Sequence, residues 1–180
     1  MQKRSTGLLT NTRNRQVPLR GRITKQVASC CVARLLILAS EDPRQPVVMQ
    51  IDTPGGSVSE SLMLISTIKG LKCPVRIVCQ GQVGGTAIAI AAQGSPGWRT
   101  ALPLTRFSFQ GLLHERTLTP GTRQLLAEIL AQSTKRSVSE TLAWMAGGAE
   151  FGTEQAIANG LIDTIAFIPP TLQVAEGDGG

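Results

Sequence analysis

Two glycine-rich turns are the parts of this chain whose residue types and spacing could do chemistry. The first, Asp52 to Gly56, follows an apolar run at 47–51 and precedes a segment with helical periodicity. The second spans 81–86, between an apolar run at 75–79 and the small residues 87–92. Such turns leave backbone N–H groups free at a helix start, where they can stabilise a phosphate or a developing oxyanion. A tight turn that needs glycine only for its dihedral angles has the same local sequence.

Side chains that could act as nucleophiles, bases or metal ligands are sparse. The four cysteines, Cys30, Cys31, Cys73 and Cys79, lack a C-x-x-C spacing and fall in apolar patterns. We therefore predict that they are small core residues in a reducing compartment, and we expect neither a metal site nor a cofactor. His114 is the single histidine, and we expect it at a strand end or in a loop without a chemical role.

The apolar spacing predicts one α/β domain. Two strand-turn-helix units in succession, 47–70 and 75–92, indicate a stacked right-handed repeat. In the first unit Ser57 and Glu60 form a predicted capping box, and Gly70 ends the helix. Its buried face should hold Val58, Leu62 and Ile65, and an earlier helix should bury Val27, Cys31, Leu35 and Leu38. The later elements predicted are a strand at 105–110, helices at 119–132, 138–147 and 153–159, and a strand at 164–168.

Several motifs in order make the chain similar to ClpP, the proteolytic subunit of the Clp protease, within the crotonase-like superfamily. They are the PGGSV segment at 54–58, the GQ turn at 81–82, the segment 94–106, and the C-terminal block 150–163. The similarity runs from Arg15 to Phe167. The resemblance implies a ClpP/crotonase-like fold over 15–168, and we expect a flexible basic segment at 1–14 and a disordered tail at 169–180.

The resemblance also implies a serine triad, which can be carried over by position. The nucleophile falls on Gly85, the histidine on Gln110 and the aspartate, counted back without gaps, on Trp144. None of these three can act as nucleophile, base or orienting acid near neutral pH. The side chain of Thr86 should point about 100° away from the nucleophile direction. The oxyanion-hole positions, the backbone N–H groups of Gly56 and Thr86, are retained.

A shortened handle helix bears on assembly. Family members form heptameric rings that stack through this helix, which resembles 119–132 here, with Leu125, Leu126, Ile129 and Leu130 as its apolar stripe. Because the handle is short, we predict a heptamer-like single ring of this chain, or a mixed ring with an active paralogue, instead of a self-made double ring.

The family docks loops of an AAA+ ATPase in an apolar surface pocket. Several of those positions are polar or small in this chain, so we expect weak docking. The polar or small positions are Gln50, Gly70, Gln80 and Thr100, and the apolar ones are Val48, Val78 and Leu102.

Composition excludes several classes of protein. No apolar run is long enough for a transmembrane helix, and we expect no membrane association and no signal peptide. The net charge of +6 is concentrated near the N-terminus. Since no aromatic stacking platform accompanies it, we interpret it as a solvated face and expect no nucleic-acid partner. We expect a bacterial cytosolic protein, with a plastid as the minor alternative.

Three functions remain open. The first is a catalytically inactive subunit with a structural or regulatory role in a ring, as in ClpR proteins. The second is an enzyme, either a serine-type peptidase with unconventional residues or a crotonase-type acyl enzyme that uses the retained oxyanion hole. The third is a homo-oligomeric module that holds a peptide in the glycine-lined cleft.

Overall fold

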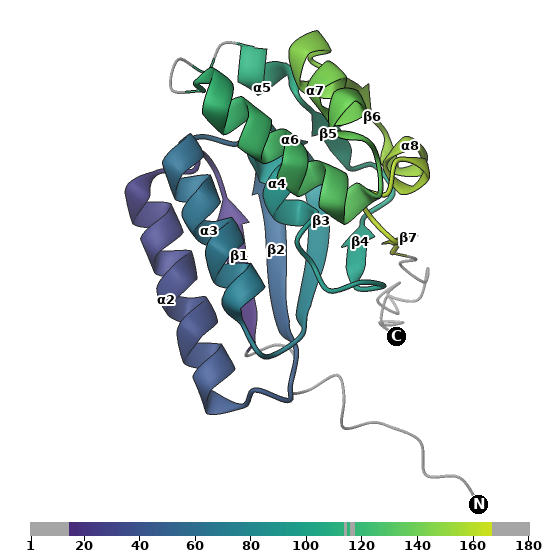
Figure 1. The fold of residues 1–180 in the computed structure, drawn as a ribbon. Coiled ribbons are helices and arrows are strands. Elements are labelled where there is room, and N and C mark those ends of the chain that lie inside the picture. Colours follow the sequence, from purple (N-terminus) through teal and green to yellow (C-terminus); the bar gives the residue numbers. More distant parts are fainter. Residues whose placement is uncertain (1–14, 114, 116–117, 167–180) are drawn as a thin grey trace, which may run out of the picture.

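The computed structural model describes residues 15–113, 115 and 118–166, which form a seven-stranded sheet with helices packed against it (Figure 1). The strand order is β1-β2-β3-β4-β7, with β5 beside the second half of β3 and β6 beside β5. Every pair is parallel except β5–β6. The strands are β1 (Gln16–Arg20), β2 (Val47–Thr53), β3 (Val75–Gly84), β4 (Arg99–Ala101), β5 (Arg106–Ser108), β6 (Glu150–Phe151) and β7 (Thr164–Ile165).

The helices connect these strands and cover one face of the sheet. In Figure 1, α3, α4 and α6 lie in front of the sheet, and α2 lies beside α3 at the left. Side chains alternate along β2, so Val47, Met49 and Ile51 are buried. The helices are α2 (Lys25–Glu41), α3 (Val58–Gly70), α4 (Ala87–Ala91), α5 (Gln110–Leu113), α6 (Pro120–Thr134), α7 (Val138–Gly147) and α8 (Thr153–Ala158).

The two predicted strand-turn-helix units are confirmed as β2–α3 and β3–α4. Helix α3 has the predicted ends, and Ser57 caps it by accepting a hydrogen bond from the Glu60 N–H. The prediction of a full capping box is wrong, because the reciprocal bond from the Glu60 side chain is absent here. A complete box instead begins α7, between Ser137 and Glu140.

Strand β3 continues five residues past the predicted strand at 75–79. The segment 81–84, which we expected to be a turn, pairs with β5 through Gln82↔Arg106, Val83↔Phe107 and Gly84↔Ser108. Gly81 adopts a φ of +58°, and the carboxylate of Asp52 accepts the Gln82 N–H at 3.2 Å. The strand therefore continues past Gly81 and exchanges β4 for β5 as the neighbour on one side, while β2 remains on the other.

The strand predicted at 105–110 is shorter, because only Arg106–Ser108 is β5. Phe109 donates its N–H to Ala149 at 2.9 Å, and the Leu112 N–H returns to the Phe109 carbonyl. Gln110 therefore begins the short helix α5, whereas we expected it to end a strand.

Some predicted core residues lie off the buried faces. Val27 and Leu62 are half-buried, with Ala28 and Leu64 buried in their place, and Leu125 of α6 is 43% exposed. Cys30 is also exposed, which makes the prediction of four core cysteines wrong for this residue. Since adjacent residues on a helix point about 100° apart, Cys30 and Cys31 cannot face the core together.

The C-terminal helices follow the prediction closely. Thr119 caps α6, Pro120 opens it, and Gly148 ends α7 in a left-handed conformation. The Thr141 hydroxyl of α7 donates to the Ala127 carbonyl of α6 at 2.9 Å, so the two helices pack closely. No helix of the described residues combines the length and apolar character needed to cross a bilayer.

His114, the segment 1–14 and the tail 169–180 lie outside the described residues, as do the last residues of the strand predicted at 164–168.

Candidate functional site

The two glycine-rich segments of the sequence meet in space. Gly55 has a φ of +95°, and a Cβ placed on it would lie 2.5 Å from the Gly84 carbonyl oxygen. A Cβ on Gly84 would lie 2.6 Å from the Pro54 carbonyl oxygen. The end of β3 and the turn after β2 therefore touch backbone to backbone, and only glycine permits this approach.

A cavity of about 250 Å³ opens beside this contact. Gly56 and Thr86, the predicted oxyanion-hole positions, both line it. The N–H groups of Gly56 and Thr86 have no acceptor among the described residues, so they can donate to a ligand oxygen. The complete lining is Arg22, Pro54, Gly56, Gly85, Thr86, Gly111, Leu112 and Glu115.

Gly56 is held from both sides by Ile23. The Ile23 N–H donates to the Gly55 carbonyl at 2.9 Å, and the Ser57 N–H donates to the Ile23 carbonyl at 3.0 Å. A Cβ on Gly56 would overlap the Ile23 backbone. The segment before α2 therefore fixes the position of one wall of the cavity.

Gly85, the predicted nucleophile position, lies in the cavity wall with a φ of +53°. Its N–H donates to the Ser108 carbonyl at 2.8 Å. A Cβ there would lie 3.5 Å from the Pro54 carbonyl oxygen and 3.8 Å from Leu112 Cδ2, which are ordinary contacts. The site has room for a side chain but offers none.

The hydroxyl of Thr86 is already engaged. It accepts a hydrogen bond from the Ser61 hydroxyl at 2.7 Å and donates to the Gly56 carbonyl at 3.5 Å. Ser61 and Thr86 are both buried. This network joins α3 to the two glycine-rich segments, and it leaves the Thr86 oxygen without a base that could activate it.

Gln110, the predicted histidine position, lies at the start of α5 and is exposed. Its N–H donates to the Ser108 hydroxyl at 3.3 Å, and its amide group lies against Gly148. The next residue, Gly111, is the one that faces Gly85: a Cβ on Gly111 would lie 3.8 Å from Gly85 Cα. Position 110 is therefore next to the residue that contacts position 85, but it is not itself that residue.

Trp144, the predicted aspartate position, lies on α7 in an aromatic cluster. Its ring centroid is 5.3 Å from that of Phe151 and 6.2 Å from that of Phe109. Trp144 is not among the residues that line the cavity. Its indole therefore packs the last helices against β5 and β6.

Ser108 and Glu150 form a polar pair that sequence reasoning missed. The Ser108 hydroxyl donates to Glu150 Oε1 at 3.0 Å, and the Ser108 carbonyl accepts the Gly85 N–H. The pair exists because β5 and β6 are antiparallel, with Ser108 opposite Glu150. Residues 42 positions apart gave no local pattern from which this contact could be predicted.

Neither the thiols of Cys31 and Cys79, which are outside the cavity lining, nor the ionisable groups that line the cavity supply a nucleophile. Burial raises the pKa of Cys79 to about 12, and burial together with Cys30 raises that of Cys31 to about 11, so both thiols stay protonated near neutral pH. Arg22, which is exposed, lies 3.7 Å from the mostly buried carboxylate of Glu115 at the cavity. In the described part of the chain, no group of three or more His, Cys, Asp and Glu residues could hold a metal ion.

A second charged site, Arg99 and Asp163, is fully bonded. Arg99 donates to both carboxylate oxygens of Asp163 and to the carbonyls of Ser133 and Gly160. Burial raises the pKa of Asp163, but the hydrogen bonds from Arg99 outweigh this effect and hold the pKa below its ordinary value. This site joins β4, α6 and the turn after α8.

The positions compared with the ATPase pocket lie mostly on one face of the sheet. Gln50 stands opposite Val78, and Val78 opposite Thr100, in neighbouring strands. Gly70 is the exception, exposed at the end of α3. The other three positions lie beside these strand pairs: Val48 is buried, and Gln80 and Leu102 are half-buried. The Gln50 side chain also bonds to that of Gln16.

Comparison with known proteins identifies the family. The Clp protease family model matches residues 3–168. The chain belongs to the Clp protease family. Two curated relatives, both named ATP-dependent Clp protease proteolytic subunit 2, come from Chlamydia trachomatis serovar D (strain ATCC VR-885 / DSM 19411 / UW-3/Cx) and serovar A (strain ATCC VR-571B / DSM 19440 / HAR-13). Each is 32% identical over 164 residues, which cover 85% of this chain and 81% of the relative.

Membership of the Clp protease family confirms the resemblance that the motifs indicated, and the parallel sheet with its helices agrees with a ClpP/crotonase-like fold. The match also begins upstream of Arg15, where we expected the similarity to start.

Proposed function

We propose that this chain is a catalytically inactive member of the Clp protease family, with a structural or regulatory role in a ring. The observation that carries the proposal is the cavity at Gly85. It is lined by two available backbone N–H groups and by glycine where the family resemblance implies a nucleophile.

Acyl transfer by a serine peptidase needs an activated oxygen within reach of the carbonyl carbon. The wall of this cavity contributes one hydroxyl, that of Thr86, which is bonded to Ser61 and Gly56. Its two ionisable side chains, Arg22 and Glu115, are paired with each other. An oxyanion hole without a nucleophile can bind a carbonyl but cannot cleave it.

Ser108 favours a second candidate, an enzyme with unconventional residues. Its hydroxyl bonds to the Glu150 carboxylate, and its backbone contacts Gly85. Carboxylates are weaker bases than the imidazole of a serine triad, so any activity by this route should be slow. The two turns offer little for crotonase-type chemistry, because the Asp52 carboxylate accepts the Gln82 N–H.

Labelling with a fluorophosphonate probe tests the leading proposal. We expect no labelling of the purified chain and no cleavage of short fluorogenic peptides, with an active Clp proteolytic subunit as positive control. Labelling that disappears in Ser108→Ala would establish the second candidate. Stoichiometric labelling at any other serine would also overturn the inactive-subunit proposal.

For assembly, we propose a heptamer-like single ring or a mixed ring with an active paralogue in the bacterial cytosol, with weak docking of an AAA+ ATPase. The support is the short helix α6 and the polar face around Gln50, Gln80 and Thr100. Native mass spectrometry of the chain alone and mixed with its host's active subunit tests this. Homomeric double rings joined through α6 would contradict it.

A homo-oligomeric peptide-binding module is the remaining alternative. It would give rings of this chain alone that bind unlabelled peptides at the Gly85 cavity, and a lack of mixed particles in the same native mass experiment would favour it.

A further inference from the structure

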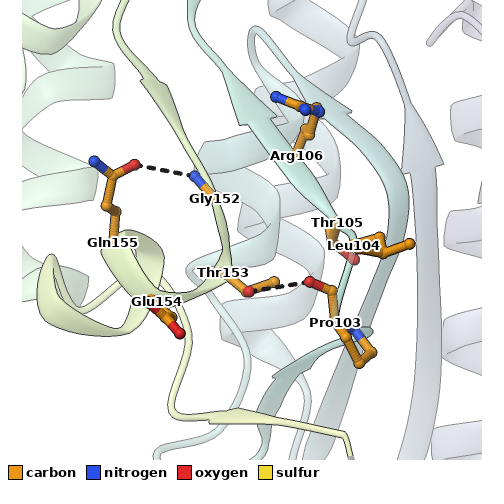
Figure 2. Close-up of a pocket in the computed structure, with 8 residues that line it drawn as sticks. All are labelled: Pro103, Leu104, Thr105, Arg106, Gly152, Thr153, Glu154 and Gln155. Carbon is orange, nitrogen blue, oxygen red and sulfur yellow. Dashed lines mark hydrogen bonds between the residues drawn. The ribbon is translucent and has the colours of Figure 1, made fainter.

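A groove that shares no lining residue with the Gly85 cavity lies between the turn after β4 and the start of α8. Two adjoining hollows of about 650 and 510 Å³ share Leu104, Arg106, Gly152 and Gln155 as lining residues. Figure 2 shows the first hollow, in which the Thr153 hydroxyl donates to the Pro103 carbonyl at 3.2 Å and so joins its two walls. The second hollow also reaches Phe107 and Phe151.

Leu104 is the most exposed large apolar residue of the described chain, at 90%. It stands at the tip of a tight turn, in which the Thr105 N–H donates to the Leu102 carbonyl at 3.0 Å. The turn is fixed at its base, because the Thr105 hydroxyl donates to the Cys79 carbonyl. A rigid turn that holds a leucine in water leaves apolar surface that a partner can bury.

The described chain ends beside this turn. Strand β7 pairs with β4 through Thr100↔Thr164 and Ala101↔Ile165, and the Ala166 N–H donates to the Ala101 carbonyl at 2.7 Å. The next donor of β4 in this ladder would be position 103, and Pro103 has no N–H, so the ladder ends at Ala166. The residues that follow are Phe167, Ile168, Pro169 and Pro170, all apolar.

We propose that residues 167–170 of the same chain bind along this groove, with the side chains of Phe167 and Ile168 covering Leu104. The contact is short-range, since a chain advances about 3.3 Å per residue and the occupant starts at the residue after Ala166. Burying Leu104 under two large apolar side chains supplies the driving force.

The charge of the groove limits the contact to this apolar stretch. Glu150, Glu154 and Arg106 line it, so acidic groups outnumber basic ones. Glu176 and Asp178, further along the tail, therefore gain nothing by entering it.

Thiol protection tests the proposal on the full chain. The background variant is Cys30→Ser, which removes the exposed thiol of the described chain. In this background, the reactivity of Leu104→Cys measures how much of the time position 104 is covered. Leu36→Cys on α2 is the control, at a residue that is 53% exposed. We expect the thiol at position 104 to react with a maleimide about tenfold faster when the tail carries Phe167→Ser and Ile168→Ser, as for a site covered nine-tenths of the time. The thiol at position 36 should react equally with both tails.

The substitutions Leu172→Ser and Val174→Ser form a matched tail control that should leave the rate at position 104 unchanged. Equal rates at position 104 with and without Phe167 and Ile168 would overturn the proposal. Protection that is lost on dilution would also overturn it, because the cover would then come from a second copy.

Amide hydrogen exchange of the chain with its natural Leu104 is the second measurement. We expect segment 103–106 to exchange faster in the Phe167→Ser, Ile168→Ser variant. Unchanged exchange there would contradict the proposal even if the cysteine substitution itself disturbed the turn.

Discussion

The Gly85 cavity and the Arg99 site show two ways of using buried polar groups. Within the described part of the chain, the cavity is built from backbone: glycines in contact, two N–H groups that have no acceptor there, and no activated nucleophile among the lining side chains. The Arg99 site is built from opposite charges whose hydrogen bonds are satisfied within the protein. The comparison teaches that buried charge here serves the fold, whereas the unsatisfied groups mark the place where a ligand could bind.

Replacing Arg99 should produce the largest loss of stability, and it tests whether the Arg99 site stabilises the fold. Arg99→Ala leaves Asp163 as a partly buried, unpaired carboxylate and frees two carbonyls, so we expect a loss of about 3–5 kcal/mol in the free energy of unfolding by urea denaturation. Arg76→Ala is the control, because Arg76 is exposed and stacks on Trp98 at 5.4 Å. It should cost about 1 kcal/mol or less. Similar losses for the two variants would remove the distinction.

Alanine substitutions at Gly55 and Gly85 test how closely the backbone segments that form the Gly85 cavity are packed. At Gly55 a Cβ would collide with the Gly84 carbonyl, whereas at Gly85 it would find space. Both glycines have positive φ, which costs alanine about 1–2 kcal/mol. We expect Gly55→Ala to lose a further 1–3 kcal/mol from the overlap, as measured by thermal or urea unfolding. Equal losses would mean that the two segments can move apart.

Restoring side chains to the cavity tests whether only the chemistry is missing. We expect weak acylation by a fluorophosphonate probe at residue 85 in the triple variant Gly85→Ser, Gln110→His, Trp144→Asp, and none in Gly85→Ser alone. The oxyanion hole can contribute about 3 kcal/mol once attack is possible. Removing Trp144 from its contacts with Phe109 and Phe151 should cost about 3–5 kcal/mol, so folding must be checked by circular dichroism. A folded triple variant without labelling would mean that the N–H groups are not aimed at a bound carbonyl.

The smallest expected effect is the pH dependence of the Arg99 site. The folded pKa of Asp163 lies below its unfolded value of about 3.9, so its stabilisation is complete well above pH 3.9 and is lost as the pH falls through the folded pKa. Urea midpoints measured from pH 6 to pH 3 should fall less steeply in Asp163→Asn than in the natural chain. Parallel curves would show that the pair contributes no pH-dependent stability.

Much of the fold could be predicted because its longer elements carry a clear period. Helices α3, α6 and α7 and strand β2 end close to where apolar spacing, caps and glycines place them. Strands β1, β4 and β6 were missed, because two to five residues cannot show a period and their pairing is decided by distant segments. The continuation of β3 past residue 79 could not be predicted for a similar reason, because its pairing with the distant strand β5 stabilises it. Gly81 and Gln82 are exposed, and their residue types are typical of a turn.

The site was predictable where it rests on motifs and unpredictable where it rests on tertiary contacts. The family resemblance implied that Gly56, Gly85 and Thr86 belong to one site, and all three line one cavity. It could not show that Gly111, instead of Gln110, faces Gly85, because that depends on the helical turn of α5. The Ser108–Glu150 pair likewise depends on an antiparallel contact between two short strands.

The change of neighbours along β3 has a consequence for the order of folding. On one side β3 pairs with β4 in its first half and with β5 in its second half, whereas on the other side it pairs with β2 in both halves, always in parallel. Parallel strands cannot be joined by a hairpin, so each pairing requires the closure of a long loop. The entropy cost of that closure comes before the hydrogen bonds of the pair can form. We expect β2, α3 and β3, which are consecutive in the chain, to assemble first and to present the edge on which β5 and the later helices condense. The cavity at Gly85, which needs both halves, is then completed late in folding.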